Sequence, residues 1–136
     1  MPVFEIVTTV SLWELVKHAS SWVRNLQNAK DERKKESKAA LRKVILAARK
    51  TGMYTSKLAK GGDRSLVTEE ELSLLWTELS FDLDDLGLDK LAKRCRIKGK
   101  HWSDPDDSDK DYLKKADVGL ERMEQLANKL LREIGN

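Results

Sequence analysis

Cysteine, proline and aromatic residues are scarce in this sequence. Its 136 residues include one Cys and two Pro, and Phe, Trp and Tyr together make up 6% of the chain. A lone cysteine, Cys95, cannot form a disulfide within the chain, so we expect a reducing compartment and place the protein in the cytoplasm. The near absence of proline leaves long segments in which no residue interrupts a helix.

Long hydrophobic runs are missing as well. No segment approaches the ~18 consecutive apolar residues that a membrane-spanning helix requires, and residues 1–7 lack the basic leader of a secretory signal. We therefore expect no contact with a membrane. The chain is long enough to bury an ordinary core without disulfides or bound metal, and we expect residues 1–136 to form one domain.

Apolar residues recur instead at helical spacing, which predicts an all-α fold, a mostly antiparallel bundle of four to five helices. Residues 1–10 are expected to be extended. Ser11, with Glu14 three residues later, is typical of a capped helix start. The apolar stripe then becomes polar and resumes only at Leu41. Residues 11–60 therefore form one helix or two, and we favour two with a break near residues 28–36, because a single helix ~60 Å long would be unusual here.

Three further helices are expected in the second half of the chain. Thr68 and Glu71 form a capping box at the start of the first, and Gly87 ends it in the left-handed conformation. A short basic helix covers residues 89–98 and stops at Gly99, and a last helix closes the bundle. The apolar stripe of the first of these three helices consists of Leu72, Leu75, Trp76, Leu79, Leu83 and Leu86.

Charge is distributed very unevenly, although the formal net charge is only +3. Residues 24–60 contain twelve basic and three acidic residues, whereas residues 61–89 contain nine acidic residues and one basic residue. Both sets follow helical spacing beside an apolar stripe, so two neighbouring helices are expected to present opposite charges to each other. The cations outnumber the carboxylates that one facing helix can offer. Part of the basic surface is therefore expected to stay open to an acidic partner or to nucleic acid.

The basic surface supplies the candidate binding residues. Lysine and arginine on one helical face are the side chains that neutralise phosphates or carboxylates. No aromatic residue is interleaved before Tyr54, so stacking on nucleic-acid bases is not expected from this helix. The alternative is a face that is solvated or paired within the bundle. The candidate residues are Lys34, Lys35, Lys38, Arg42, Lys43, Arg49 and Lys50.

The sequence carries no decisive signature of a metal or cofactor site. Glu78 and Asp82 are faintly similar to the Glu-x-x-Asp element of helical-bundle pyrophosphohydrolases that bind Mg²⁺, but three residues rather than two separate them here. The Gly61-Gly62 turn lacks the Lys-Ser/Thr sequence of a phosphate-binding loop. We therefore predict no bound metal and no cofactor.

One short motif suggests catalysis. Arg96 and His101 are separated by four residues, a spacing that resembles the Arg-x4-6-His element of the HEPN family of small helical-bundle ribonucleases. The resemblance covers six residues and implies that His101 transfers a proton at the RNA 2′-hydroxyl, that Arg96 stabilises the developing negative charge, and that two copies pair. These roles suit the side chains, because His titrates near neutral pH and Arg stays charged.

Four tryptophans stand out among the few aromatic residues. Trp22 and Trp76 fall on apolar stripes and are expected in the core, whereas Trp13 and Trp102 are candidates for a protein interface. The sequence therefore predicts a non-enzymatic interaction module that binds a protein partner or a second copy of itself, with nucleic acid as a further candidate. A HEPN-like, metal-independent ribonuclease is the alternative.

Overall fold

The structure of the chain, a computed structural model, consists of helices and connecting turns. It describes residues 3–105 and 110–135, and the side chains of residues 15–105 and 119–135. The helices are α1 (Val3–Leu26), α2 (Asp31–Ala59), α3 (Leu66–Asp85), α4 (Asp89–Ser103) and α5 (Lys110–Ile134). The predicted all-α bundle is confirmed, and the described ranges contain no strand. Over the same ranges, no helix has an apolar stretch long enough to cross a membrane.

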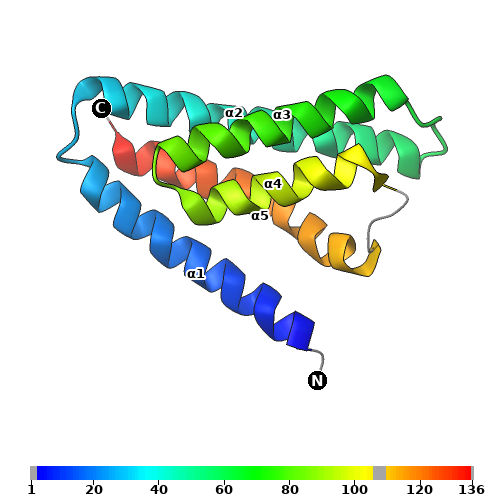
Figure 1. The fold of residues 1–136 in the computed structure, drawn as a ribbon, viewed down its shortest axis with the longest axis horizontal. Helices are drawn as coiled ribbons and strands as arrows, with labels where there is room; N and C mark the ends of the chain where they lie inside the picture. Colours follow the sequence, from blue (N-terminus) through cyan, green and yellow to red (C-terminus); the bar gives the residue numbers. More distant parts are fainter. Residues whose placement is uncertain (1–2, 106–109, 136) are drawn as a thin grey trace.

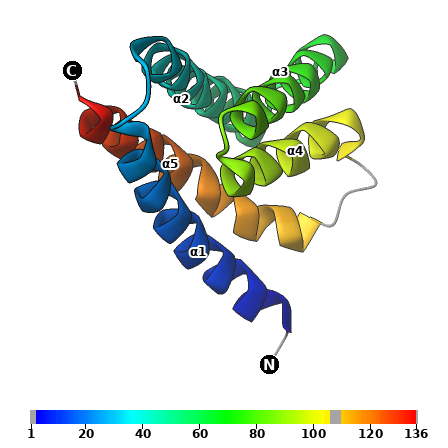
Figure 2. The same cartoon turned by 60° about the vertical axis from the view of Figure 1, so that its left-hand side comes forward.

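Figures 1 and 2 show how the five helices are arranged. α2 and α3 run antiparallel, and α4 returns antiparallel along α3. α5 packs against α2, and α1 lies beside α5 and runs in the same direction. α2 is thus contacted mainly by α3 and by α5, and one side of it faces solvent.

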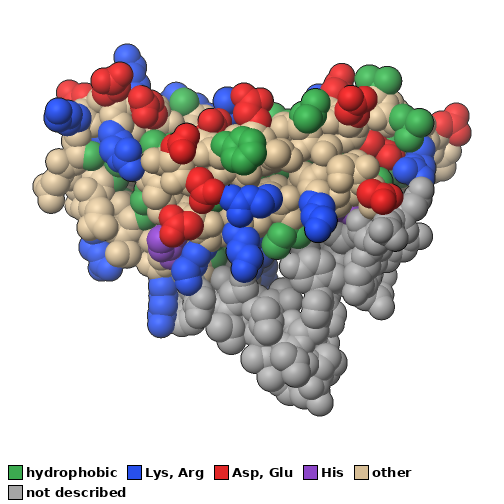
Figure 3. Space-filling model, in the orientation of Figure 1, with side chains coloured by type: hydrophobic (Ala, Val, Ile, Leu, Met, Phe, Trp, Pro, Cys, Tyr) green, Lys and Arg blue, Asp and Glu red, His purple; other side chains and the backbone are tan. Residues whose placement is uncertain are grey.

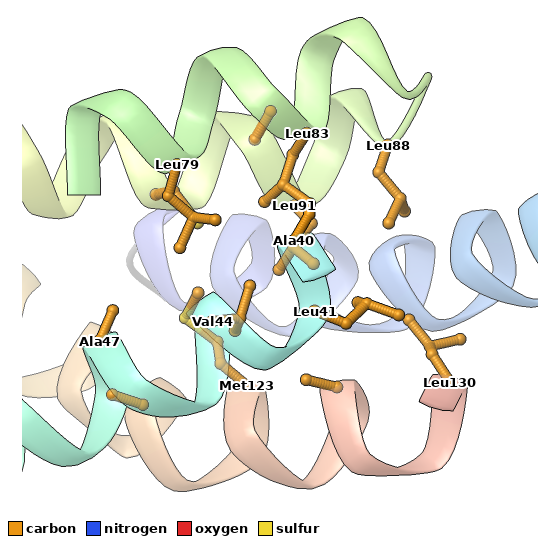
Figure 4. Packing of buried hydrophobic residues seen from close by; sticks show 14 of the residues in the cluster. Ala40, Leu41, Val44, Ala47, Leu79, Leu83, Leu88, Leu91, Met123 and Leu130 are labelled. Carbon is orange, nitrogen blue, oxygen red and sulfur yellow. The ribbon is translucent and has the colours of Figure 1, made fainter. Parts of the chain in front are cut away.

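The core lies where α2 meets α3 and α5. Leu41 and Val44 of α2 are fully buried. Figure 4 shows them between Leu83 of α3 and the pair Met123 and Leu130 of α5. Burying a large aliphatic side chain of this kind stabilises the fold by ~1.5–3 kcal/mol, so this seam holds α2 firmly to α3 and α5.

Trp22 and Trp76 both lie in the core, as predicted. Trp76 is fully buried, and its indole Nε1 donates to the hydroxyl of Thr51 at 2.9 Å. Thr51 in turn donates to the carbonyl of Ala47 at 2.7 Å. The buried indole N–H therefore has an acceptor, which avoids a desolvation cost of ~1–3 kcal/mol.

α1 and α2 are separate helices joined at residues 27–30, which confirms the predicted break. Trp22 Nε1 donates to the carbonyl of Leu86 at 2.8 Å, and the guanidinium of Arg33 donates to the same oxygen at 3.0 Å. Leu86 is the C-cap of α3, and Gly87 follows with a φ of 86°, the predicted left-handed conformation. One carbonyl at the end of α3 thus holds both sides of the corner between α1 and α2.

The expected extended segment at residues 1–10 was wrong over the described residues, because α1 begins at Val3. Ser11 accordingly lies inside α1 and does not cap it. No Pro or Gly occurs between residues 3 and 26, so nothing stops a helix formed farther along from propagating toward the N-terminus. The Val and Thr residues that gave a strand-like pattern cost a helix only ~0.7 kcal/mol each or less.

The N-cap of α3 is Ser65, three residues before the predicted cap at Thr68. Ser65 has an extended backbone, and its hydroxyl oxygen accepts a hydrogen bond from the backbone N–H of Thr68 at 3.2 Å. The geometry is that of an N-cap and its third residue. The prediction was wrong because Ser and Thr give the same capping signal, and only the path of the turn decides between them.

α4 continues through Gly99 to Ser103, so the prediction that this helix stops at Gly99 was wrong. Gly99 faces α3. The hydroxyl of Ser73 donates to the Gly99 carbonyl at 2.8 Å, and a Cβ atom at Gly99 would lie 2.4 Å from Oγ1 of Thr77. Glycine at this position therefore allows α3 and α4 to approach closely.

Replacing Gly99 by alanine is expected to lower the free energy of unfolding by ~1–3 kcal/mol, because the new Cβ would overlap Thr77 and the Ser73 carbonyl. Gly52→Ala in α2 is the matched control. A Cβ at Gly52 meets no atom within 4 Å, so alanine there should raise the free energy of unfolding by ~0.5–1 kcal/mol. Chemical denaturation of the parent and the two variants measures both changes, and effects of the same sign would contradict the close approach.

Candidate interaction surface

Three of the predicted basic residues are engaged by carboxylates of neighbouring helices. Arg49 pairs with Glu124 of α5, while Lys43 and Lys50 reach α3. The expected attraction between α2 and α3 is therefore present, although each exposed pair contributes only ~0–1 kcal/mol. The ion pairs to α3 are Lys43–Asp82 at 3.2 Å, Lys43–Glu78 at 3.9 Å and Lys50–Glu71 at 3.1 Å.

The other four predicted basic residues, Lys34, Lys35, Lys38 and Arg42, form no ion pair with the described residues. The three lysines line a shallow hollow of about 580 Å³ at the N-terminal end of α2, together with two carboxylates of the first turn. This part of the basic surface is open to a negatively charged partner.

Large exposed hydrophobic side chains gather on α2 and α3. Among the described side chains, α1, α4 and α5 carry none. Figure 3 shows hydrophobic and acidic side chains alternating over α3. An apolar surface with a charged rim is typical of a site that binds another macromolecule. The exposed residues, with exposed fractions between 58% and 75%, are Leu46, Met53, Leu66, Val67, Leu74 and Phe81.

Most of these residues belong to two outward rows of side chains. We call the row on α2 the basic ridge and the row on α3 the acidic ridge. Within each ridge the exposed apolar residues are seven positions apart, and they lie nearly in line because seven residues are close to two helical turns. The basic ridge consists of Lys35, Arg42, Leu46, Met53, Lys57 and Lys60. The acidic ridge consists of Val67, Glu70, Leu74, Glu78, Phe81 and Asp85.

A second hollow, of about 770 Å³, lies on the C-terminal half of the basic ridge. Met53 lines it with 74% of its side chain exposed. An apolar side chain surrounded by cations suits a ligand that is both apolar and negatively charged. The cations that line this hollow are Lys57 and Lys60, together with Arg49 and Lys50, which pair with Glu124 and Glu71.

Trp102 is buried, with 8% of its surface exposed, so its prediction as an interface residue was wrong. Its ring packs edge-on against Tyr54, with ring centroids 5.6 Å apart, and against His101 at 4.7 Å. The cause is the extra length of α4, which carries Trp102 onto the face that contacts α2. Trp13 lies in α1, but its side chain is outside the described residues, so its role stays a prediction.

Arg96 and His101 are not brought together within one chain. Both lie on α4, where residues five apart point about 140° away from each other. Arg96 pairs with Asp84 of α3, whereas the His101 ring packs edge-on against Trp102 and its Nδ1 atom is buried. The two side chains therefore contact different neighbours.

Glu69 forms a buried cluster that the sequence did not reveal. It is only 4% exposed, and its carboxylate accepts hydrogen bonds from the hydroxyl of Tyr54 and from the guanidinium of Arg64 at 2.8 and 3.1 Å. The hydrogen bonds of Arg64 hold the pKa of Glu69 below its ordinary value despite burial, and Tyr54 and nearby His101 lower it further. With its charge satisfied on several sides, this carboxylate closes the turn between α2 and α3.

The remaining buried reactive groups offer little chemistry. Cys95 is fully buried, and burial raises the pKa of its thiol to about 12 although nearby Lys98 opposes the shift. A thiol of this kind is not a nucleophile at neutral pH. In the described part of the chain, no three His, Cys, Asp or Glu side chains are arranged to hold a metal ion.

The sequence did contain a signal for the exposed ridges. Leu74 and Phe81 lie off the apolar stripe of α3, as do Leu46 and Met53 relative to the buried face of α2. A large apolar residue on the solvent side of an amphipathic helix suggests a second contact. Whether such a residue is exposed depends on where the neighbouring helices lie, which the spacing within one helix does not specify.

Similarity to known proteins does not bear on this surface. Comparison of the chain with protein-family models, with curated proteins and with solved structures finds no match. The geometry of the two ridges is therefore the basis for a functional proposal.

Tyr54→Phe is expected to lower the free energy of unfolding by ~1–3 kcal/mol, because the hydroxyl also accepts the backbone N–H of Ser65 at 2.9 Å. Chemical denaturation at neutral pH measures this change.

Glu69→Gln tests the charge of the cluster. Since the folded-state pKa of Glu69 lies below its ordinary value of 4.5, the advantage of the parent over this variant is full above that value and shrinks as pH falls through the folded-state pKa. Denaturation at neutral pH and at about pH 3 measures the two differences. An equal difference at both pH values would show that the charge is not involved.

Proposed function

We propose that the protein is a non-enzymatic interaction module whose basic ridge binds an acidic, amphipathic helix of a protein partner. The observation that carries the proposal is the exposure of Leu46 and Met53, 64% and 74%, in a row whose other members are cations. Isolated exposed apolar residues are common on protein surfaces. Two of them in line, continuous with those of the neighbouring helix, form a surface that a partner can dehydrate.

The chemistry of the ridge defines the partner. A helix docked along α2 would place apolar side chains every seven residues over Leu46 and Met53 and carboxylates beside the flanking cations. Arg42 on one side and Lys57 on the other lie close enough in sequence to frame both apolar residues. Complementary charge of this kind mainly sets orientation and the rate of association, while the apolar contacts contribute most of the affinity.

Nucleic acid is the second candidate partner, supported by the lysines at the N-terminal hollow, Lys34, Lys35 and Lys38. Phosphates would neutralise these side chains. The apolar members of the basic ridge gain nothing from a phosphate backbone, and the ridge carries no aromatic side chain on which a base could stack. An acidic protein helix therefore accounts for more of the ridge than nucleic acid does.

The ribonuclease alternative gains no support from α4, because Arg96 is paired with Asp84 and His101 packs on Trp102. A protein-binding role in the cytoplasm, where the single cysteine would stay reduced, remains our proposal for the whole chain.

A double substitution, Leu46→Lys with Met53→Lys, separates the two candidate partners. It removes the apolar part of the ridge and adds positive charge. Binding of a designed helical peptide, with leucine every seventh residue and glutamate beside it, is expected to weaken at least ~10-fold, because buried apolar area is lost. Binding of a single-stranded RNA should be unchanged or tighter. Fluorescence anisotropy at low protein concentration measures both.

Two further variants control this experiment. Lys35→Glu with Arg42→Glu should weaken both the peptide and the RNA, since both probes are negatively charged. Arg132→Glu, an exposed substitution on α5, should affect neither. Peptide binding that survives the loss of Leu46 and Met53 while RNA binding responds only to charge would rule out the acidic-helix partner.

A further inference from the structure

The basic and acidic ridges lie side by side on one face of the molecule and have opposite charge. α2 and α3 are neighbouring antiparallel helices, and each carries exposed apolar residues at seven-residue spacing on its outward side. The charged members of the α2 row are all cations, and those of the α3 row are all carboxylates. The acidic ridge thus has the properties that the proposed function requires of a partner for the basic ridge.

We infer that the occupant of the basic ridge is the acidic ridge of a second copy of this chain. The inference rests on the proposed function, of which it names the partner. In the resulting dimer α2 of each copy lies on α3 of the other, and a two-fold axis runs parallel to these helices between the two faces. Each copy supplies both ridges, so the contact is made twice and closes without leaving either ridge exposed.

Charge selects this arrangement over the other symmetric one. A two-fold axis perpendicular to the helices would place α2 on α2 and α3 on α3, so that cations face cations and carboxylates face carboxylates. An axis parallel to the helices places each basic ridge on an acidic ridge instead. Like charges brought together without partners oppose association, whereas opposite charges favour it and fix the register.

The ion pairs within one chain predict which residues meet. Lys43 lies opposite Asp82 and Lys50 opposite Glu71, which sets the relative height of α2 and α3. An axis parallel to the helices leaves every height unchanged. Leu46 of one copy then comes level with the interval between Leu74 and Phe81 of the other copy, two residues that are seven positions apart.

The same register predicts which residues meet at the two ends of the interface. Arg42 precedes Lys43 in α2, and Asp85 lies one turn beyond Asp82 in α3, so these two charges come within reach of each other across the interface. Neither Arg42 nor Asp85 forms an ion pair with the described residues of its own chain. Met53 comes level with the interval between Val67 and Leu74 toward the opposite end.

The size of this face sets the affinity range to test. α3 has 20 residues and is therefore ~30 Å long, and two adjacent helices present a face on the order of 600 Å² per copy. A stable interface usually buries about 800 Å² per partner. Dimerisation in the micromolar range is thus expected, and sedimentation equilibrium of the full chain from about 1 to about 500 µM covers it.

Charge reversal tests the geometry. Arg42→Glu alone places two carboxylates together in both copies of this contact, and Asp85→Arg alone places two guanidinium groups together. Each variant by itself is expected to dimerise at least ~10-fold more weakly than the parent. An equimolar mixture of the two should form a heterodimer about as tight as the parent dimer, since every pair then has opposite charges. The double variant on one chain should likewise regain self-association.

The apolar contact has its own test and control. Leu74→Ser with Phe81→Ser removes side chains that are 64% and 58% exposed, so the monomer should keep its helical circular dichroism while dimerisation weakens at least ~10-fold. Arg132→Glu on α5 matches the charge change of Arg42→Glu away from the ridges and should dimerise like the parent.

The possible failures are distinguishable. A parent chain that stays monomeric up to about 500 µM, yet binds the acidic helical peptide through Leu46 and Met53, would overturn the second-copy partner and leave the proposed function standing. A dimer that is insensitive to both charge reversals would place self-association on another face and overturn the inference. Weak dimers of each variant without rescue in the mixture would exclude the pairing of α2 with α3. A parent chain that neither binds the acidic helical peptide nor self-associates would overturn the proposed function itself.

Discussion

Two hydrogen bonds to one oxygen, the carbonyl of Leu86, set the geometry on which the rest of the bundle depends. The last carbonyls of a helix have no partner within that helix, and this one accepts from Trp22 before the α1–α2 corner and from Arg33 after it. A shift of the corner would leave the buried indole N–H of Trp22 without its acceptor, at a cost of ~1–3 kcal/mol. The start of α2 is therefore held against the end of α3.

The opposite ends of α2 and α3 are held by the cluster of Tyr54, Arg64 and Glu69. With both ends fixed by hydrogen bonds that are buried or partly buried, the relative height of the two helices is determined before the exposed ion pairs are considered. Those pairs, worth ~0–1 kcal/mol each, follow from the register more than they create it. The same register decides which side chains face outward, so the two ridges are a consequence of the buried contacts at the helix ends.

The sequence predicted the helices better than their ends, and the charges better than the apolar part of the surface. The spacing of apolar residues predicted the all-α fold and the break between α1 and α2. The count of charges along the chain predicted the surplus of cations that includes Lys35. Gly87 and Gly99 were both predicted as helix ends. Gly87 does end α3, whereas Gly99 lies within α4 and allows α3 to approach closely. Trp102 and Leu74 illustrate the same limit, because whether an apolar side chain is covered depends on helices distant in sequence.

The residues of the two ridges lie outside the core, so the side chains that would contact a partner differ from those that stabilise the fold. Leu46, Met53, Leu74 and Phe81 are more than half exposed, and substitutions at such positions usually change stability by only ~0.5 kcal/mol or less. Evolution could therefore alter the partner without endangering the bundle. A lineage of such proteins would be expected to diversify along these two rows while keeping the residues around Leu86 and Gly99, so that one scaffold could serve several specificities.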